Sequence, residues 1–402
     1  MANIAIMGYG TVGSGVYEII TANHEIIKSH ALNNEIDVTR ILDLREFPDH
    51  PHPEIFTKNF DDILNDDSIT VVAEMMGGLH PAYEFTKQLL LAGKSVITSN
   101  KELVATYGTE LMEIAIKNNK NYLFEASVGG GIPIIRPMHQ CLSANKVTRI
   151  AGILNGTTNY ILNEMFKKGK TFEEALEDAQ NKGYAEKNPA ADVEGHDACR
   201  KIAILASLAC RKFVDYNQIR TEGITHITLE DVKYAAAMDS VIKLIGYAEF
   251  MDNGELYSVV APMVIHNDTP ISLVNGVFNA IMVTGDCVGD VMFYGRGAGK
   301  LPTASAVVAD IIDSVKHEQR SKNIAWDASD SSFMTDPDKK EVSYFVRTTK
   351  KPDEVEKVFV LTNKIEGIVE GEFGFVTEKM AECEVKAKMK ELGGVVSAVR
   401  ML

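Results

Sequence analysis

The chain has 402 residues, 45% of them hydrophobic and 24% charged, and its 41 basic against 56 acidic side chains leave a net charge of −15. At roughly 150 residues per domain, this length favours two to three domains, each with a sizeable core. The acidic balance disfavours nucleic acids and anionic membranes as partners, because both are polyanions. No stretch of sequence approaches the roughly 18 apolar residues that a membrane-spanning helix needs.

The start of the chain and its cysteines favour a cytoplasmic protein. An apolar strand runs directly into a glycine turn at Gly8, which is not the pattern of a secretory signal peptide. The five cysteines are odd in number and lack Cys-x-x-Cys spacing. This usage is typical of reduced thiols and predicts no cysteine metal site.

The first third of the chain alternates between strand-like and helix-like patterns. Apolar runs predict strands over 3–7, 36–42, 69–74, 95–98 and 121–126, and helical spacing predicts helices over 81–92 and 101–118. Such alternation predicts an α/β fold with a doubly wound parallel sheet of the Rossmann type. We therefore expect a dinucleotide-binding domain over 1–135, completed by 296–320.

The regular alternation of strands and helices ends after residue 135. The expected strands are 147–155, 342–348, 366–377 and 394–400, and the expected helices are 156–168, 171–182, 196–212, 302–318, 352–361 and 378–392. We expect an α+β substrate-binding and dimerisation domain over 136–295, whose Val- and Ile-rich stretch 255–294 can supply a sheet shared between subunits. The polar stretch 321–339 predicts a linker, and 340–402 predicts a small α+β domain.

A glycine turn joins the first strand to the first helix. In Gly-x-Gly-x-x-Gly, Gly8 makes the tight turn, Gly10 lets the backbone approach a pyrophosphate, and Gly13 lets helix and sheet pack closely. Thr11 and Val12 open the helix, where free N–H groups and the positive dipole end attract an anion. The turn predicts a nicotinamide dinucleotide; the alternative is a purely structural strand–helix turn.

The second strand ends at Asp43, a candidate ligand of the adenosine ribose. A carboxylate there favours NAD over NADP. Asp43 lies 30 residues beyond Gly13, however, which is longer than the usual spacing of about 20. Arg40 and Arg45 could still reach a 2′-phosphate, and Asp43 could be a simple turn residue.

Asp197 and Lys201 are the strongest catalytic candidates. They lie four residues apart on a predicted helix and share its face with Ile204 and Leu208. A charged pair on an apolar stripe points inward, and buried charges need partners or a use. An inward lysine beside a carboxylate can transfer a proton. The alternative is an ordinary surface ion pair.

Two further candidates follow strands of the predicted sheet. Lys101 comes directly after the strand at 95–98, at the carboxyl edge where ligands of open α/β sheets bind; the alternative is a solvated lysine. Glu125 precedes the triple glycine 129–131, whose carbonyls together with the carboxylate could hold a hard monovalent or divalent cation. The alternative for this segment is a flexible interdomain connection.

Six blocks of sequence resemble homoserine dehydrogenases, across essentially the whole chain. They are GYGTVGSGV (8–16), SNKELVATYG (99–108), FEASVGGGIPII (124–135), GILNGTTNYIL (152–162), KGYAEKNPAADVEGHDACRKIAIL (182–205) and GRGAGKLPTASAVVAD (295–310). The resemblance implies the NAD(P)-dependent interconversion of L-homoserine and L-aspartate 4-semialdehyde in threonine and methionine biosynthesis. The segment 340–402 resembles an ACT domain, a regulatory fold often appended in this family.

The resemblance also implies roles for individual residues. Lys201 matches the acid/base lysine, Asp197 its carboxylate partner, and Lys101 a second active-site lysine. Glu186 matches the glutamate that recognises the substrate amino group. The remaining substrate positions are Gly156, Thr157, Tyr184 and Asp192. Gly299 matches a glycine near the nicotinamide. A sodium site, with potassium as the other monovalent candidate, matches Glu125, Val128, Gly130 and Ile132, three of them through main-chain carbonyls.

Two positions depart from the family pattern. Many relatives carry Arg where this chain has Leu42, which weakens the case for NADP. The tail reads Lys351-Pro-Asp-Glu354 in place of the Asp-x-Pro-Gly turn of ligand-binding ACT domains, which leaves threonine as an open candidate effector. The competing interpretations are another Rossmann dehydrogenase, such as one acting directly on aspartate or its semialdehyde, and a nucleotide-binding amino-acid sensor without catalysis. An acylating enzyme would need a nucleophilic cysteine; no cysteine lies in a recognisable loop beside a paired histidine, although Cys199 lies between Asp197 and Lys201.

Overall fold

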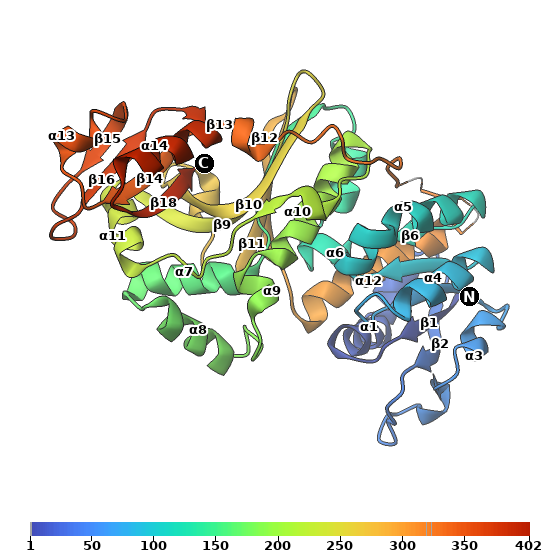
Figure 1. The fold of residues 1–402 in the computed structure, drawn as a ribbon. Coiled ribbons are helices and arrows are strands. Elements are labelled where there is room, and N and C mark those ends of the chain that lie inside the picture. The colour runs from blue at the N-terminus through green and yellow to red at the C-terminus, as the bar shows by residue number, and fades with distance from the viewer. Residues whose placement is uncertain (1, 319, 323) are drawn as a thin grey trace. The chain divides into compact units, whose positions relative to one another are not determined.

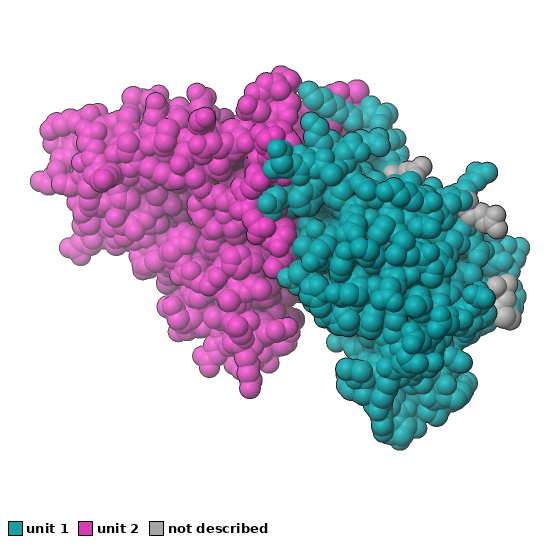
Figure 2. All heavy atoms as spheres, turned by 45° about the vertical axis from the view of Figure 1, so that its right-hand side comes forward, with its two compact units in different colours: residues 1–146, 203–215, 295–330 teal, residues 147–202, 216–294, 331–402 magenta. Residues whose placement is uncertain are grey.

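The computed structural model describes residues 2–318, 320–322 and 324–402, and these form two compact units. Unit 1 comprises residues 1–146, 203–215 and 295–330, and unit 2 comprises 147–202, 216–294 and 331–402 (Figure 2). Each unit has its own main sheet. In the part of the chain that the structure describes, no helix is both long enough and apolar enough to cross a membrane.

Unit 1 is built on a six-stranded sheet in the order β3-β2-β1-β4-β5-β6, with every pair parallel. The strands are β1 (Ala2–Met7), β2 (Ile36–Leu42), β3 (Phe56–Thr57), β4 (Ile69–Glu74), β5 (Ser95–Thr98) and β6 (Tyr122–Leu123). This is the doubly wound order of a dinucleotide-binding fold, in which successive strands are added on one side of β1 and then, from β4 onward, on its other side. The predicted parallel α/β sheet is confirmed.

The helices of unit 1 flank this sheet (Figure 1). They are α1 (Thr11–Ala22), α2 (His24–His30), α3 (Asp61–Leu64), α4 (Ala82–Leu91), α5 (Lys101–Lys117), α6 (Ala126–Gly129) and α12 (Lys300–Lys316), with short turns at Pro53–Ile55 and Pro137–Cys141. Helix α12 comes from late in the sequence but packs on α1. The two helices lie so close together that a Cβ on Gly15 of α1 would be 2.9 Å from the carbonyl oxygen of Lys300 on α12.

The last strand of this sheet is shorter than predicted. We expected a strand over 121–126, but β6 ends at Leu123 and residues 126–129 form a helical turn. The physical reason is a tertiary contact: the Glu125 main-chain N–H donates to the carboxylate of Asp310, 2.9 Å away on α12, instead of to a neighbouring strand.

Unit 2 contains a ten-stranded sheet in the order β12-β11-β7-β9-β10-β18-β14-β16-β15, with β8 paired to β10. The strands are β7 (Val147–Ile153), β8 (Arg220–Thr221), β9 (Ser240–Phe250), β10 (Leu256–His266), β11 (Phe278–Gly285), β12 (Gly289–Arg296), β14 (Tyr344–Thr348), β15 (Leu361–Ile365), β16 (Phe373–Thr377) and β18 (Val395–Met401). The long hairpin β9–β10 is its centre, and buried residues of β7, β9, β10 and β11 form an apolar core on one face.

Seven helices belong wholly or partly to unit 2 in the described part of the chain. They are α7 (Gly156–Lys168), α8 (Phe172–Asn181), α9 (Ala190–Val193), α10 (His196–Cys210), α11 (Leu229–Ala237), α13 (Pro352–Val355) and α14 (Glu382–Leu392). Short turns lie at Tyr216–Gln218, Pro270–Leu273 and Pro337–Lys339, and β13 (Glu341–Val342) pairs with β17 (Met380–Ala381). Helices α7 and α11 pack on β9, a strand that the sequence pattern did not predict.

The C-terminal segment folds as β14-α13-β15-β16-α14-β18, with the strand order β18-β14-β16-β15 and its own apolar core. This βαββαβ arrangement is the ferredoxin-like motif. Its sheet continues that of the preceding residues, because β18 pairs in parallel with β10 through Met263–Arg400 and Val264–Met401. The expected helix 352–361 and strand 366–377 are corrected: the helix ends at Val355, and residues 361–365 form one arm of the β15–β16 hairpin.

Candidate active site

The glycine turn of unit 1 has the geometry that a dinucleotide needs. Gly8 has φ +91° and a Cβ there would lie 2.9 Å from the Met75 carbonyl, while a Cβ on Gly13 would lie 2.0 Å from the Gly8 oxygen. A Cβ on Gly10, in contrast, would meet no atom within 4 Å. Gly10 is the N-cap of α1, and no side chain accepts a hydrogen bond from the N–H groups there. The N–H groups of Thr11 and the residues after it are therefore directed at a cradle that an anion can fill.

Asp43 lies against this turn, at the end of β2. Its Oδ2 accepts a hydrogen bond from the Tyr9 main-chain N–H at 2.8 Å, and its two oxygens accept from the Arg45 guanidinium at 3.0 and 2.8 Å. The hydrogen bonds from Arg45 lower the pKa of Asp43 to about 2, so the carboxylate is ionised at neutral pH. Asp43 thus contacts the glycine turn through Tyr9, and it also makes a local turn by accepting from the Arg45 main-chain N–H at 2.9 Å.

Lys101 is the first residue of α5 and is partly exposed. Asn100 caps this helix by accepting from the Leu103 N–H at 3.1 Å, and its amide donates to the Gly78 carbonyl at 2.6 Å. Because all six strands are parallel, the residues that follow β1, β2 and β5 share the carboxyl edge of the sheet. Lys101 therefore lies on the same edge as the glycine turn.

Glu74 ends β4 at this edge and was missed by the sequence analysis. It is fully buried and accepts hydrogen bonds from the Met76 N–H and the Thr98 hydroxyl, both at 2.7 Å. Burial raises its pKa above the ordinary range. Its place inside an otherwise apolar strand is the signal that could have identified it, because buried carboxyl groups need partners.

The Glu125 carboxylate is committed to the main chain. It accepts from the N–H groups of Ile134, Ile135 and Arg136 at 2.5 to 2.8 Å. Three N–H donors thus hold the carboxylate in place, and the main-chain carbonyls of this segment are further oxygens that a cation could use. Residues 125–130 are all buried, so the segment is not an exposed flexible connection. In the described ranges, no group of three or more His, Cys, Asp or Glu side chains could hold a metal ion.

The glycines of this loop allow α12 to approach. A Cβ on Gly130, which has φ +57°, would lie 2.2 Å from the Gly297 oxygen, and the Gly131 N–H donates to the Arg296 carbonyl at 3.1 Å. Gly299 is the N-cap of α12 with φ +125°. The triple glycine and the glycines before α12 therefore form one packed turn.

Asp310 anchors the same turn and was also missed. It lies on α12, accepts from the Glu125 N–H at 2.9 Å and pairs with Arg136 at 2.6 Å. Complete burial raises its pKa to about 7. An aspartate within the apolar helical pattern 302–318 was the available signal, but its partner 185 residues away was not visible in the sequence.

The predicted pair of Asp197 and Lys201 in unit 2 points inward, as the apolar face of its helix indicated. The Lys201 Nζ lies 2.9 Å from the Asp197 Oδ2 and donates to the Leu154 carbonyl at 2.8 Å. Lys201 is 8% exposed and Asp197 is 5% exposed, so the alternative of a solvated surface pair is excluded. A buried lysine in contact with a carboxylate and a carbonyl can exchange a proton with a bound molecule.

Asn155 connects this pair to a second carboxylate. Its Nδ2 donates to the Asp197 Oδ2 at 3.0 Å and to the Asp192 Oδ1 at 2.7 Å, while its Oδ1 accepts from the Thr158 N–H at 2.9 Å. Asn155 thereby caps α7 and fixes both carboxylates. The sequence analysis missed it, although an Asn directly before a predicted helix is a typical N-cap.

The other predicted substrate residues lie around the start of α7. Gly156 begins this helix, and a Cβ there would lie 2.8 Å from the Val277 carbonyl. The Thr157 hydroxyl donates to the Tyr184 carbonyl at 2.6 Å. Glu186 follows two residues later on an exposed stretch, where its own carbonyl accepts from Gln180. The structure thus groups Gly156, Thr157 and Tyr184 near Asp192, and leaves the Glu186 side chain exposed.

Comparisons with known proteins identify the family of this chain. Residues 8–125 match the family described as homoserine dehydrogenase, NAD binding domain, and residues 133–312 match the family homoserine dehydrogenase. The homoserine dehydrogenase of Synechocystis is 45% identical over 318 residues, covering 78% of this chain and 73% of that protein.

Solved structures give the same result. The homoserine dehydrogenase of Thiobacillus denitrificans superposes with a TM-score of 0.91 at 32% identity, covering 100% of this chain and 98% of that one. A hyperthermophilic archaeal homoserine dehydrogenase in complex with NADPH has a TM-score of 0.66 at 28% identity, covering 78% of this chain and 97% of that one. The chain therefore belongs to the homoserine dehydrogenase family, NAD(P)-dependent oxidoreductases that interconvert L-homoserine and L-aspartate 4-semialdehyde.

Proposed function

We propose that Lys201 is the acid/base group of this dehydrogenase and that Asp197 and the Leu154 carbonyl hold its ammonium in place. The supporting observation is the buried contact of the Lys201 Nζ with both oxygens, at 2.9 and 2.8 Å. In homoserine oxidation, neutral Lys201 accepts the proton of the substrate hydroxyl. In the reverse direction, the ammonium returns a proton to the developing alkoxide. The nicotinamide cofactor, when bound, accepts or donates the hydride.

The residues of the glycine turn fit such a cofactor. The open cradle at Gly10 and the uncapped start of α1, with Thr11, Val12 and Gly13, suit a pyrophosphate, Asp43 suits a ribose, and Gly299 is assigned to the nicotinamide side. We propose a preference for NAD, because the ionised Asp43 repels a 2′-phosphate and already engages Arg45. Comparing kcat/KM for NADH and NADPH tests this preference, and a higher value for NADPH would contradict it.

We assign roles to the other residues that match the family. Glu186 pairs with the substrate ammonium, and Lys101 acts as the second lysine of the active site. The pocket positions are Gly156, Thr157, Tyr184 and Asp192. Support comes from the grouping of the last four around the Asn155 cap.

A sodium or potassium ion completes the proposal. Its ligands are Glu125, Val128, Gly130 and Ile132, three of them through main-chain carbonyls, and three N–H donors hold the Glu125 carboxylate in place. Hard monovalent cations accept such oxygen ligands. Activity should fall when tetramethylammonium replaces both ions and should survive EDTA; full activity without them would contradict the site.

We further propose that the protein is a cytoplasmic homodimer or higher oligomer whose domains have separate roles. Residues 1–135 with 296–320 bind the cofactor, and residues 136–295 bind the substrate and the second subunit. Residues 321–339 are a linker to residues 340–402, which form an ACT-like regulatory domain with threonine as its effector. The βαββαβ topology of the C-terminal segment supports the last assignment. Sedimentation at micromolar concentration tests the oligomer, and threonine titration of turnover tests the effector.

The first prediction concerns Lys201. Lys201→Met should lower kcat by roughly 10²–10⁴-fold, the contribution of a positioned acid/base group. NADH binding, followed by fluorescence titration, should change little, because the glycine turn is untouched.

Lys168→Met is the matched control. Lys168 pairs with Glu164 at the same i, i+4 spacing, 2.7 Å apart, but its side chain is exposed. This variant should retain wild-type turnover. Near-normal kcat in a folded Lys201→Met enzyme would remove Lys201 from the mechanism.

The second prediction separates binding from chemistry. Glu186→Gln keeps the size of the side chain but removes the charge opposite the substrate ammonium. KM for the semialdehyde should rise by about tenfold or more, since charged hydrogen bonds contribute ~1.5–3 kcal/mol, with a smaller change in kcat. An unchanged KM would show that Glu186 does not hold the ammonium.

The third prediction concerns Asn155 as a positioning residue. Asn155→Ala removes a helix cap, at a cost of about 0.5–2 kcal/mol of stability, and also frees Asp197 and Asp192. Thr171→Ala removes the cap of α8, where Thr171 accepts from the Glu174 N–H, and serves as the control. Both variants should lose similar thermal stability, but only Asn155→Ala should lower kcat and displace its pH profile. Equal kcat in the two variants would show that Asn155 stabilises the helix but does not position the catalytic carboxylates.

A further inference from the structure

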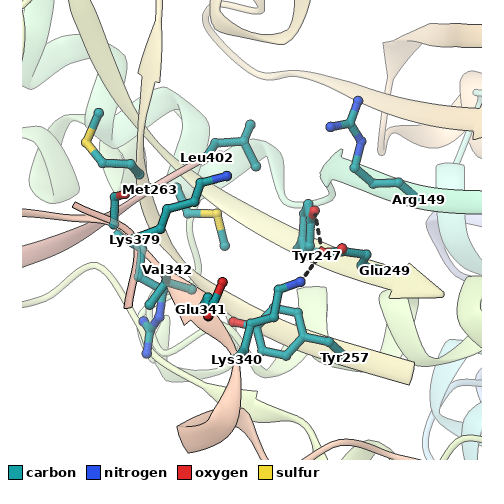
Figure 3. Close-up of a pocket in the computed structure, with 13 residues that line it drawn as sticks. Arg149, Tyr247, Glu249, Tyr257, Met263, Lys340, Glu341, Val342, Lys379 and Leu402 are labelled. Carbon is teal, nitrogen blue, oxygen red and sulfur yellow. Dashed lines mark hydrogen bonds and ion pairs between the residues drawn. The ribbon is translucent and has the colours of Figure 1, made fainter. Parts of the chain in front are cut away.

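Two acidic side chains, one in each unit, have different kinds of partner. In the cavity of about 320 Å³ where residues 340–343 and 400–402 meet β9 and β10, Glu249 pairs with Lys340 at 2.8 Å (Figure 3). Glu74 of unit 1, which the proposed mechanism does not use, has a hydroxyl and a main-chain N–H as partners instead. These partners belong to the carboxyl edge of the parallel sheet, where the cofactor binds. Glu74 is therefore a candidate for positioning the backbone at that edge.

The Glu74 carboxylate connects the segment after β4 with the segment after β5. Glu74 lies opposite Thr98 in the pairing of these strands, and it accepts from the Thr98 hydroxyl and from the Met76 N–H, both at 2.7 Å. The Thr98 hydroxyl oxygen accepts from the Asn100 N–H at 2.9 Å, and the Asn100 amide donates to the Gly78 carbonyl at 2.6 Å. These four hydrogen bonds hold the two segments in one arrangement.

The segment after β4 lies directly beside the glycine turn. The Met75 N–H donates to the Met7 carbonyl at 2.7 Å, and a Cβ on Gly8 would lie 2.9 Å from the Met75 carbonyl. Gly77 and Gly78 are exposed, with φ of +77° and +68°, and a Cβ on either would meet no atom within 4 Å. The positive φ favours glycine at both positions, and the open space leaves their main chain accessible to a ligand.

The strand order indicates which half of the cofactor meets this segment. In the order β3-β2-β1-β4-β5-β6, the switch point lies between β1 and β4, and a dinucleotide binds across the carboxyl edge there. Asp43, the residue proposed above for the adenosine ribose, follows β2 on one side of this point. The segments after β4 and β5 lie on the other side, where α5 begins with Lys101. They therefore belong to the nicotinamide half.

We propose that Glu74 is a positioning residue for the nicotinamide half of the cofactor. By bonding to Thr98 and to the main chain at Met76, its carboxylate fixes the segment after β4 against the start of α5. A segment that is ordered beforehand binds more tightly than one that the ligand must order. Glu74 is 0% exposed, so it acts through the main chain between Met76 and Gly78. The inference deepens the proposed function and rests on its assignment of the adenosine ribose to Asp43.

The test compares binding of NADH with binding of ADP, which carries the adenosine half alone. Both are titrated into the full chain, NADH by fluorescence and ADP by calorimetry. Glu74→Gln keeps the size of the side chain but replaces one acceptor oxygen with an amide that cannot accept. Kd for NADH should rise by about tenfold, because a buried donor loses its acceptor. Kd for ADP should not change.

Variants of Thr98 test the same hydrogen bonds, including the case in which Glu74→Gln does not fold. Thr98→Val removes the hydroxyl, and Thr98→Ser keeps it and removes only a methyl group. Thr86→Val is the matched control, because Thr86 on α4 is also 0% exposed and its hydroxyl has no hydrogen-bond partner among the described residues. Only Thr98→Val should weaken NADH binding, again by about tenfold. If NADH affinity instead follows the thermal stability of the three variants, the role of Glu74 is merely structural and the inference is wrong.

Asp43→Ala separates this inference from the proposal on which it rests. This variant should weaken NADH and ADP binding alike. If it does, and Glu74→Gln weakens both ligands equally or neither, the role of Glu74 is refuted and the proposed cofactor site stands. If Asp43→Ala leaves ADP binding unchanged, the proposed orientation of the cofactor is wrong, and the assignment of Glu74 to the nicotinamide half is refuted as well.

Discussion

The buried Lys201 ammonium is the constraint around which unit 2 is arranged. Removing a charge from water costs several kcal/mol, and the cost is offset only where the partners are well placed. Here the strand–helix junction after β7 supplies them at one point: Leu154 gives a carbonyl to the ammonium, and Asn155 gives its amide to the carboxylate that pairs with it. The same amide caps α7. Helix start and ion pair are therefore fixed by the same two residues.

Carboxylates do different work in unit 1, where they fix the backbone. Glu125 accepts hydrogen bonds from three N–H groups and Asp310 accepts one from the N–H of Glu125, so these two acids shape the turn beside α12. Asp43 differs because it keeps a pKa of about 2 through Arg45 while binding the glycine turn. The charge of a carboxylate is thus a poor guide to its role until its partners are known.

The sequence predictions that the structure confirms rest on local patterns. The strands at 36–42, 69–74 and 95–98 and the helix at 156–168 have the predicted bounds, because their apolar periodicity is continuous and their ends carry clear stop signals. The inward direction of Lys201 also followed from spacing alone. In each case the deciding information lies within a few residues.

Non-local pairing explains what was missed. Strand β6 is cut short by a contact with Asp310, far along the chain. The pairing of β18 with β10 was not predicted, because no local pattern reveals it. Asn155 was recognisable as a helix cap, but its bonds to Asp192 and Asp197 depend on the fold. The sequence therefore identifies chemically distinctive residues better than it identifies those that position them.

The cost of the Lys201 pair also separates the competing functions. A protein that only sensed nucleotides or amino acids would gain stability from an apolar pair of similar volume at these positions, because such replacements are often neutral or stabilising. An acylating mechanism would depend on Cys199, whose thiol is buried and directed at the Tyr216 carbonyl, 3.3 Å away. A desolvated lysine paired with a carboxylate is costly for stability but can move a proton. Proton transfer to and from a hydroxyl is what the dehydrogenase reaction requires beyond its cofactor.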